Sequence, residues 1–322
     1  MRLGRVTLAF LKAAWLVGLF TVLGSQPCAA DVKITFLDVG QGDSAVIQIT
    51  QPTGEPFTII VDGGNGDSDL KANLVTLLAH DPTVELVVLS HPHKDHTGAL
   101  DWLINSTFAV KRVWWTEESV HEGNYDRFKD RIQKKGIPAE RPTESIHSFP
   151  GFSNFRLRVF NNGQEFPGTD GDSINNDSLV FQLIYEPASE VKTTVLFTGD
   201  IEREQGEMQV SQFGDELKSD IVKVPHHGSD KLFEQFQAKV AARFAFVSSS
   251  GTNATFMHPR KTAIDLYART AQVFCTCDAA QKKINFTAVL SDDGDISVSP
   301  SQPPYFVWER QSNNKFKRIT VQ

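Results

Sequence analysis

The hydrophobic positions of this 322-residue chain form short runs and helical repeats that alternate along its length. Short apolar and β-branched runs predict strands, and apolar positions spaced three or four apart predict amphipathic helices. Strands are expected at 32–37, 44–50, 56–61, 84–90, 111–116, 155–160, 179–185, 193–198, 221–224, 244–248 and 272–276, and further strands with a turn at 293–294 are expected within 285–298. Helices are expected at 70–80, 97–105, 125–135, 201–213, 231–242 and 261–269.

The order of these elements predicts the fold class. The run at 84–90 is almost continuously apolar, as is typical of a strand that is buried on both faces. Strands precede helices in both halves of the chain, which indicates a layered α/β domain with helices outside the sheets. Residues 136–175 are rich in Pro, Gly, Asn and Ser and predict a loop, either a plain surface insertion or the border of a substrate groove. No linker or repeat interrupts the pattern, so 31–322 is expected to be one domain.

The first thirty residues have the layout of a secretory signal peptide. Arg2 and Arg5 precede an apolar run at 8–23, and small residues precede a cleavage site after Ala30. The alternative is a retained membrane anchor. No later segment is long and apolar enough to cross a bilayer. The protein is therefore expected to be secreted or periplasmic, with no stable membrane anchor after processing.

The composition is that of a soluble globular protein, with 40% hydrophobic and 22% charged residues. Loss of residues 1–30 removes three basic residues and no acidic ones, so the formal charge goes from −7 to −10. Such a chain lacks the broad basic surface of most nucleic-acid-binding proteins. A nuclease stays open, because bound divalent metals can supply positive charge at the site itself.

Cys275 and Cys277 are the two cysteines of the segment 31–322, too few for a disulfide framework. We expect them to be a pair of strand residues, since free cysteine is generally buried. A redox pair or a pair of metal ligands is the alternative, but no further Cys or His lies nearby to support ligation.

The segment 90–98 carries the strongest chemical signal. His91, His93, Asp95 and His96 fall within six residues at the end of the predicted strand at 84–90. Imidazole and carboxylate are the usual ligands of zinc and similar divalent metals. A strand end holds its side chains with little freedom, so a metal site is predicted here rather than a chance polar loop.

Further candidates follow other predicted strands. Asp200 comes directly after Gly199 at the end of the strand at 193–198, where its carboxylate could bridge two metals. His226 and His227 follow the strand at 221–224. His258 is a weaker candidate, because a single histidine is more often structural than a ligand.

Three aspartates in glycine-rich turns have two interpretations. Asp38, Asp43 and Asp62 each lie next to or near glycine, which is typical of turns. Alternatively they support the ligands from behind, because a ligating imidazole usually donates its other N–H to a carboxylate. We favour the supporting role for Asp62.

Together these residues resemble the metallo-β-lactamase fold superfamily, and more closely the hydrolase domain of the DNA-uptake channel protein ComEC/Rec2, in a stand-alone secreted form. The resemblance implies a four-layer αββα sandwich with metals at one edge between the sheets. It covers nearly all of 31–322. It rests on Phe36-Leu37-Asp38-Val39-Gly40-Gln41-Gly42-Asp43, Ser90-His91-Pro92-His93-Lys94-Asp95-His96, Asn175-Asn176-Asp177-Ser178-Leu179-Val180, Leu196-Phe197-Thr198-Gly199-Asp200-Ile201-Glu202 and Val222-Lys223-Val224-Pro225-His226-His227-Gly228-Ser229.

The resemblance also implies a set of metal ligands. The positions that match superfamily ligands are His91, His93, Asp95, His96 and Asp200. His226 resembles the later ligand histidine, although His258 could share or take that role.

One departure from the superfamily pattern affects the choice of metal. Many members have a further histidine about two dozen residues before the Gly-Asp, where this chain has Asn175, Asn176, Asp177 and Ser178. An oxygen ligand, from Asn176 or Asp177 for example, shifts the preference toward harder ions such as manganese. Two divalent metal ions are expected, either zinc or manganese.

The expected reaction is hydrolysis of a phosphodiester by a water that two metals activate. Asp95 and Asp200 take part directly, while Lys223 or His227 assists with phosphate charge or the leaving group. The substrate could be DNA or RNA. A phosphodiester of the cell envelope or of a phosphocholine type is the alternative, and a β-lactam fits less well. A non-catalytic metal-containing binding module is the alternative of another class, but the ligands outnumber the needs of one structural metal.

Overall fold

The structure is a computed structural model of the whole chain. It describes residues 31–50, 55–116, 120–163, 166, 171–187, 191–250, 257–276, 284–302, 305–310 and 316–321. The predicted signal peptide at 1–30 and Cys277 lie outside these residues. Within them, no helix has both the length and the apolar character that a membrane span requires.

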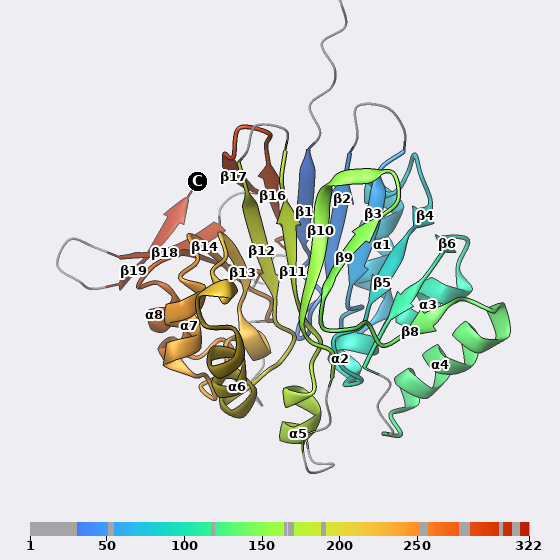
Figure 1. Cartoon of the computed structure of the whole chain (residues 1–322), viewed down its shortest axis with the longest axis horizontal. Helices are drawn as coiled ribbons and strands as arrows, with labels where there is room; N and C mark the ends of the chain where they lie inside the picture. The colour runs from blue at the N-terminus through green and yellow to red at the C-terminus, as the bar shows by residue number, and fades with distance from the viewer. Residues whose placement is uncertain are drawn as a thin grey trace, which may run out of the picture.

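Two large sheets form the centre of the molecule (Figure 1). The first has the strand order β17-β16-β1-β2-β3-β5-β7-β8. Its strands are β1 (Val32–Phe36), β2 (Ala45–Ile49), β3 (Phe57–Val61), β5 (Leu86–Val88), β7 (Val113–Trp114), β8 (Ala139–Glu140), β16 (Phe286–Leu290) and β17 (Ile296–Pro300). A small separate pair consists of β4 (Thr83–Val84) and β6 (Ala109–Val110).

The second sheet has the order β19-β18-β15-β14-β13-β12-β11-β10-β9. Its strands are β9 (Ile146–Phe149), β10 (Phe152–Asn161), β11 (Val180–Tyr185), β12 (Thr193–Phe197), β13 (Ile221–Lys223), β14 (Phe244–Val247), β15 (Gln272–Cys275), β18 (Tyr305–Arg310) and β19 (Phe316–Val321). The strands from β12 to β15 are parallel, as are β3, β5, β7 and β8 of the first sheet.

Helices cover the outer faces of both sheets. They are α1 (Asp67–Leu77), α2 (Lys94–Thr97), α3 (Leu100–Asn105), α4 (Gly123–Lys135), α5 (Gly171–Asn176), α6 (Arg203–Phe213), α7 (Glu234–Val240) and α8 (Lys261–Tyr267), with short 3₁₀ turns η1 (Gly214–Leu217) and η2 (Pro225–Gly228). Buried side chains of α1, α3 and α4 pack on the first sheet, and those of α7 and α8 pack on the second. The architecture is therefore the four-layer αββα sandwich that was predicted.

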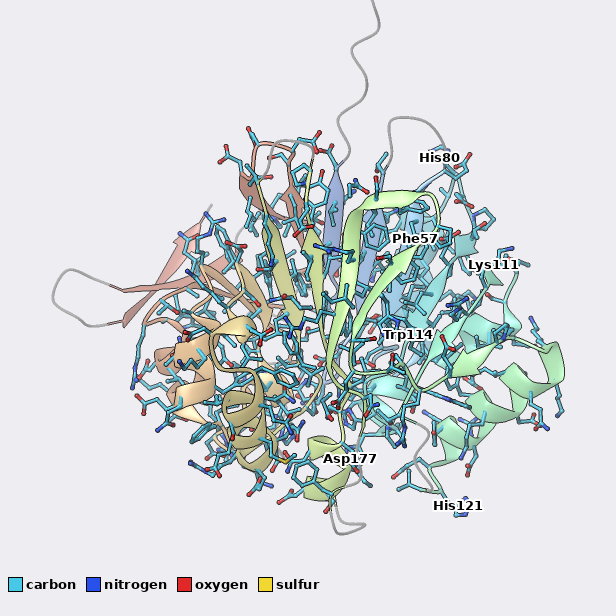
Figure 2. All side chains as sticks on the ribbon, in the orientation of Figure 1. Phe57, His80, Lys111, Trp114, His121 and Asp177 are labelled. Atoms are coloured by element: carbon cyan, nitrogen blue, oxygen red, sulfur yellow. The ribbon has the colours of Figure 1, made fainter. Side chains whose placement is uncertain are left out.

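The side chains of the described strands alternate between two faces and, with those of the helices, form three hydrophobic cores. One face of each sheet contributes to an apolar layer between the sheets, where the Phe36 and Phe246 rings stack with centroids 4.1 Å apart. Phe57 and Trp114 belong to the same layer (Figure 2). The opposite faces of the strands are apolar as well, because helices cover them. This double burial explains why several strands read as continuous hydrophobic runs.

The predicted elements are mostly present, with differences at the ends and in the loop-like region. The strands expected within 285–298 form the hairpin β16–β17, and its turn at residues 291–295 includes the expected turn at 293–294. The region 136–175, expected to be mostly loop, contains β8, β9, the long strand β10 and α5. Tertiary pairing of β10 with β11 supplies the hydrogen bonds that local sequence preference does not predict.

The topology brings the chemically informative loops to one end of the sandwich. Parallel strands present their carboxyl ends at the same edge of a sheet, and the loops after β3, β5, β12, β13 and β14 all start there. Helices α2 and α5 lie at this end of the molecule (Figure 1). Candidate ligands far apart in sequence are therefore neighbours in space.

Candidate metal centre

Asp62 anchors the segment that carries the histidines. It follows β3 with a φ of 57°, in the left-handed region that aspartate tolerates better than most residues. One carboxylate oxygen accepts the backbone N–H of Ser90 at 2.7 Å, and the other lies 2.8 Å from Ser90 Oγ and 2.9 Å from His96 Nδ1. The carboxylate therefore holds the Nδ1–H of His96 and leaves Nε2 free to face Asp200. This geometry matches the supporting role favoured for Asp62.

His91 and His93 lie next to one another at the end of β5. The His91 ring is fully buried, and its Nε2 lies 3.1 Å from His93 Nδ1. Its Nδ1 lies 3.1 Å from Ser90 Oγ and 3.2 Å from Ser178 Oγ. Burial, together with the nearby charges of His96 and His93, lowers the pKa of His91 well below its usual value. His91 is therefore neutral at pH 7, which is the form that binds metals.

Asp200 lies at the centre of the cluster. One carboxylate oxygen, Oδ2, is 3.2 Å from His96 Nε2 and 3.1 Å from His227 Nε2. Burial alone would raise the pKa of Asp200, but His227, His96 and His226 lower it well below its usual value. The preceding Gly199 has a φ of 51°, and a Cβ there would come within 2.6 Å of Ser178. Only glycine fits this close turn, which directs the Asp200 carboxylate inward.

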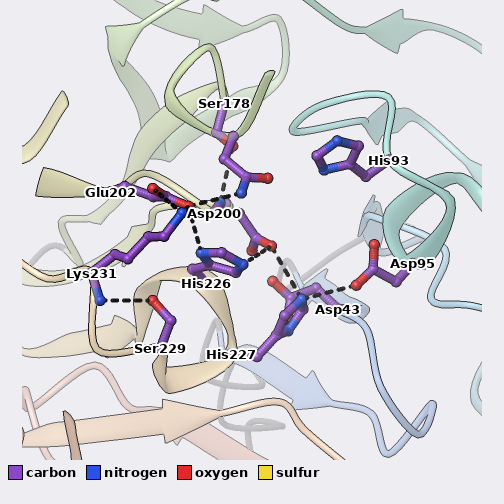
Figure 3. A network of polar contacts seen from close by, with 12 residues as sticks. Asp43, His93, Asp95, Ser178, Asp200, Glu202, His226, His227, Ser229 and Lys231 are labelled. Atoms are coloured by element: carbon purple, nitrogen blue, oxygen red, sulfur yellow. Dashed lines mark hydrogen bonds and ion pairs between the residues drawn. The ribbon is translucent and has the colours of Figure 1, made fainter. Parts of the chain in front are cut away.

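The two adjacent histidines of η2 have different environments (Figure 3). The Nδ1 of His227 donates to Ser248 O at 3.0 Å, and its Nε2 lies 3.2 Å from Asp95 Oδ2. The Nε2 of His226 is farther from the centre, 4.0 Å from Asp200 Oδ2. Its Nδ1 lies 3.0 Å from Glu202 Oε1. His227 thus lies at the centre of the cluster and His226 at its border.

Among the residues that the structure describes, four overlapping groups of side chains could hold a metal ion, each with its ligand atoms within 4.8 Å of one another. They are His91 with His96 and Asp200; Asp95 with His96 and His227; Asp43 with Asp62 and His96; and Asp43 with Asp200 and His227. His93, His226 and His258 are not in these groups, although all three line the cavity beside them.

Two unsatisfied nitrogens test whether the cluster fits a metal. Within the described part of the chain, His96 Nε2 and His227 Nε2 are buried and have no hydrogen-bond partner of suitable geometry. Both lie just over 3 Å from the same oxygen of Asp200. Buried polar atoms without partners are costly, and a bound ion would satisfy both. The residues present therefore fit a divalent metal.

Residues 175–178 stand where many superfamily members have a further histidine, and their side chains make two kinds of contact. Asn176 Oδ1 accepts the backbone N–H of Glu202 at 2.8 Å, and Asp177 Oδ1 accepts that of Phe166 at 2.7 Å. These oxygens, expected as metal ligands, are thus engaged by backbone groups. Asn175 is different: its Nδ2 donates to Glu202 Oε1 at 3.0 Å, and its Oδ1 is buried without a partner. Asn175 lines the cavity together with His93.

Lys223 lies beneath the cluster and is only 4% exposed. It forms an ion pair with Asp43 Oδ2, and its Nζ is 3.7 Å from Asp200 Oδ1. Burial opposes its charge, but Asp43 and Asp200 raise its pKa above the usual value. Lys223 was expected to assist with the charge of a phosphate group. In the structure its ammonium group faces the carboxylates of Asp43 and Asp200 and does not line the cavity.

Asp43 and Asp38 differ in their relation to the cluster. Asp43 Oδ1 lies 3.2 Å from His227 Nδ1, so Asp43 supports a ring of the cluster from behind. Asp38 instead accepts the backbone N–H groups of Gly40 and Ile284, at 3.0 and 3.1 Å. It ties the turn after β1 to the segment before β16, which is the turn interpretation rather than a contact with the ligands.

A cavity of about 540 Å³ opens beside the cluster. Asp95, Asp200 and His227 contribute to its wall, so a substrate in it would touch the candidate metal centre. His258 also lines it, and its ring centroid lies 5.3 Å from that of His226. Burial and the nearby His226 lower the pKa of His258 to about 4.

Sequence reasoning missed several residues of this site. They are Ser90, Glu202, Lys231 and Arg260, which contact or line the cluster and its cavity. Ser90 and Glu202 lie inside the motifs that carry the resemblance. Ser90 directly precedes His91, and Glu202 is two residues after Asp200, so their sequence positions could have indicated that they lie at the site. Lys231 and Arg260 carry no such signal.

Cys275 is a residue of β15, as expected, but it is not free. It is disulfide-bonded, and the other cysteines of the chain, Cys28 and Cys277, lie outside the described residues. The expectation of a pair of free strand cysteines is therefore wrong for Cys275.

Among known protein families, the one described as "Metallo-beta-lactamase superfamily" matches residues 37–181 of this chain. This segment runs from the end of β1 into β11 and includes the segment 90–98. The match confirms the resemblance to the metallo-β-lactamase superfamily that the motifs predicted. Members are generally metal-dependent hydrolases, and the groups around Asp200 could hold such metals.

Two curated relatives support the resemblance to the ComEC-like branch. ComE operon protein 3 of Bacillus subtilis (strain 168) is 25% identical over 265 residues, which cover 76% of this chain and 31% of that protein. The uncharacterized protein YcaI of Escherichia coli (strain K12) is 25% identical over 278 residues, which cover 83% of this chain and 31% of that protein. The chain thus spans about a third of the length of either relative.

Solved structures show more distant likenesses. An isothiocyanate hydrolase from Delia radicum gut bacteria is 11% identical with a TM-score of 0.46, covering 76% of this chain and 97% of that one. A metallo-β-lactamase from Hirschia baltica is 17% identical with a TM-score of 0.34, covering 66% of this chain and 92% of that one.

Proposed function

We propose that the protein is a metal-dependent phosphodiesterase that acts on nucleic acid or on another phosphodiester. The observation that carries the proposal is the convergence of His96 Nε2 and His227 Nε2 on one oxygen of Asp200 at the wall of a cavity. The resemblance of the sequence motifs to the hydrolase domain of the DNA-uptake channel protein ComEC/Rec2 favours a nucleic-acid substrate.

The described residues suggest two neighbouring metal positions that share Asp200. Asp95, His96 and His227 would hold one ion. His91 and His93 would hold the other, with the Asn175 amide oxygen as the most suitable group of its stretch. When bound, such ions lower the pKa of water and neutralise charge on phosphoryl oxygens. The amide oxygen favours manganese over zinc at the second position.

The chain's own residues would orient this centre and keep it charged. Asp62 holds the His96 ring by its Nδ1, while Ser248 O and Asp43 hold the His227 ring by its Nδ1. Lys223 stabilises the negative charge of Asp43 from the buried side. The rings and carboxylates are thus oriented before a substrate arrives, which is what efficient catalysis requires.

We also propose that the protein functions outside the cytoplasm. The disulfide at Cys275 supports this, because disulfides persist in oxidising compartments. The sequence pattern of residues 1–30 supports it as well. Mass spectrometry of the protein secreted by its native host would identify the N-terminus, and retention of residues 1–30 in the cytoplasm would contradict this part of the proposal.

The test of the proposed function combines metal analysis with activity. After chelation, manganese or zinc is added back, and turnover is measured on bis-p-nitrophenyl phosphate, single-stranded DNA and a β-lactam. We expect two equivalents of metal and hydrolysis of the phosphodiesters. Hydrolysis of the β-lactam alone would contradict the substrate class, and absence of bound metal would contradict the metal-dependent mechanism. Bound metal without turnover of any of the three substrates would support the metal-containing binding module.

A further inference from the structure

Among the described residues, three lysine and arginine side chains line the cavity, and they differ in how their charge is neutralised. Lys231 is already paired, because its Nζ contacts Asp172 and lies 3.2 Å from Glu202 Oε2. Lys94 is exposed at the start of α2. Arg260, directly before α8, makes no ion pair within the described residues, although it lies at the cavity wall. Its charge is the one partly enclosed positive charge of the wall that no described carboxylate neutralises.

The position of Arg260 is well defined by its surroundings. Its backbone N–H donates to Gly228 O at 2.7 Å, which ties it to the turn that carries His226 and His227. It lies close enough to His258 for its charge to act on that ring. The His258 ring is in turn 6.1 Å from the His227 ring, between centroids. Arg260 therefore lies close to the turn and to the histidine that border the candidate metal centre.

The guanidinium also has an unsatisfied donor. Arg260 Nε is buried and has no hydrogen-bond partner within the part of the chain that the structure describes. A buried N–H donor without a partner costs free energy, more so on a charged group. An anion in the cavity would satisfy both the donor and the charge, and the guanidinium fork fits the oxygens of a phosphate in a bidentate manner.

We propose that Arg260 is the anion-recognition residue of the cavity and that it binds a phosphate group of the substrate. The inference rests on the proposed function and deepens it, because it makes a negatively charged phosphate a requirement for binding rather than only the group that is cleaved. The phosphate is either the scissile one or its neighbour in a polymer. Neutral esters and amides lack the group that Arg260 recognises.

The test compares Arg260→Gln and Arg260→Lys with the matched control Arg269→Gln. Arg269 follows α8 and does not line this cavity, and its charge is already paired with Glu234. Metal-loaded proteins are assayed on bis-p-nitrophenyl phosphate, on single-stranded DNA and on the neutral ester p-nitrophenyl acetate. In a second arm, the rise in Tm on addition of inorganic phosphate is measured.

We expect Arg260→Gln to raise KM for phosphodiesters about tenfold or more, with kcat for p-nitrophenyl acetate unchanged. Arg260→Lys recovers part of the loss, because it keeps the charge without the fork, and Arg269→Gln behaves as wild type. An equal loss on both phosphodiesters indicates the scissile phosphate, whereas a loss on DNA alone indicates its neighbour. Phosphate raises the Tm of the wild type but not of Arg260→Gln.

Unchanged KM values together with an unchanged phosphate-induced rise in Tm in Arg260→Gln would overturn the inference. An equal loss on the neutral ester would also overturn it, because it would indicate general damage to the site. If the wild type hydrolyses no phosphodiester, the proposed function fails. In that case the Tm arm still decides whether Arg260 binds phosphate.

Discussion

Replacement of Asp62 separates the stability of the fold from its capacity to bind metal. The carboxylate is 2% exposed and has three partners, at 2.7, 2.8 and 2.9 Å. Asp62→Ala leaves the buried N–H of Ser90 without an acceptor, which costs about 1–3 kcal/mol. Alanine in the left-handed region costs about 1 kcal/mol more. We therefore expect a loss of about 2–4 kcal/mol in the free energy of unfolding of the metal-free protein.

Asp62→Asn is the matched variant that preserves most of these features. Asparagine tolerates the left-handed backbone, and its oxygen can still accept the N–H of Ser90. Its NH₂ group, however, cannot accept the Nδ1–H of His96, so the ring loses its fixed orientation. Loss of such a supporting group lowers metal affinity about 10- to 100-fold. We expect this loss with unfolding close to that of the wild type.

The assays are urea unfolding of the metal-free proteins and competition titration of manganese or zinc against a chelating dye. Two results would refute the reasoning. One is an Asp62→Asn protein that binds metal as tightly as the wild type. The other is an Asp62→Ala protein that unfolds at the wild-type urea concentration, which would mean that the three hydrogen bonds of the structure contribute nothing.

Other predictions concern the cluster, its protonation and the core. Asp200→Asn should abolish turnover and reduce the bound metal while circular dichroism shows a folded protein; retained turnover would contradict a central role. Burial opposes protonation of His96 and His227, but Asp200 raises the pKa of both well above the usual value of about 6.5 in the metal-free protein. The two protonated rings therefore stabilise the metal-free fold fully below pH 6.5, and this contribution declines as the pH rises through the raised pKa values. Metal affinity should instead increase with pH, because the ions displace these protons. Isothermal titration of metal between pH 6 and 9 checks the direction, and an affinity that does not change with pH would contradict it. Phe246→Ala removes a stacked ring from the layer between the sheets and should cost about 3–5 kcal/mol in urea unfolding, and a loss below about 1 kcal/mol would contradict its role in the core.

Particular residues show how far the sequence alone could lead. Four ligand-type side chains within six residues after an apolar strand predicted a metal site at His91–His96, because local spacing already places them together. The Gly199-Asp200 pair was readable for a similar reason, since glycine before the aspartate indicated a tight turn. The layered α/β class followed from the alternation of strand and helix periods.

Only the tertiary structure decided how the two halves of the chain share the site. In the sequence, His226 and His227 are equivalent neighbours, and the left-handed backbone of η2 determines that His227 faces Asp95 and Asp200 while His226 faces Glu202. The partners of a side chain at a turn depend on elements that lie far away along the chain. Local sequence preferences carry no information about such distances.

Dependence on distant elements also explains which residues of the site could be predicted from the sequence and which could not. Asp62, next to two glycines after a strand, could be suspected from the sequence, but its contact with His96 across 34 positions depends on the pairing of β3 with β5. Arg260 carries no motif, and only the packing of its segment against Gly228 brings it to the cavity. The sequence by itself determined the ligand types and the layer architecture. The tertiary structure decided which of those groups converge, because convergence arises from strand order and not from local spacing.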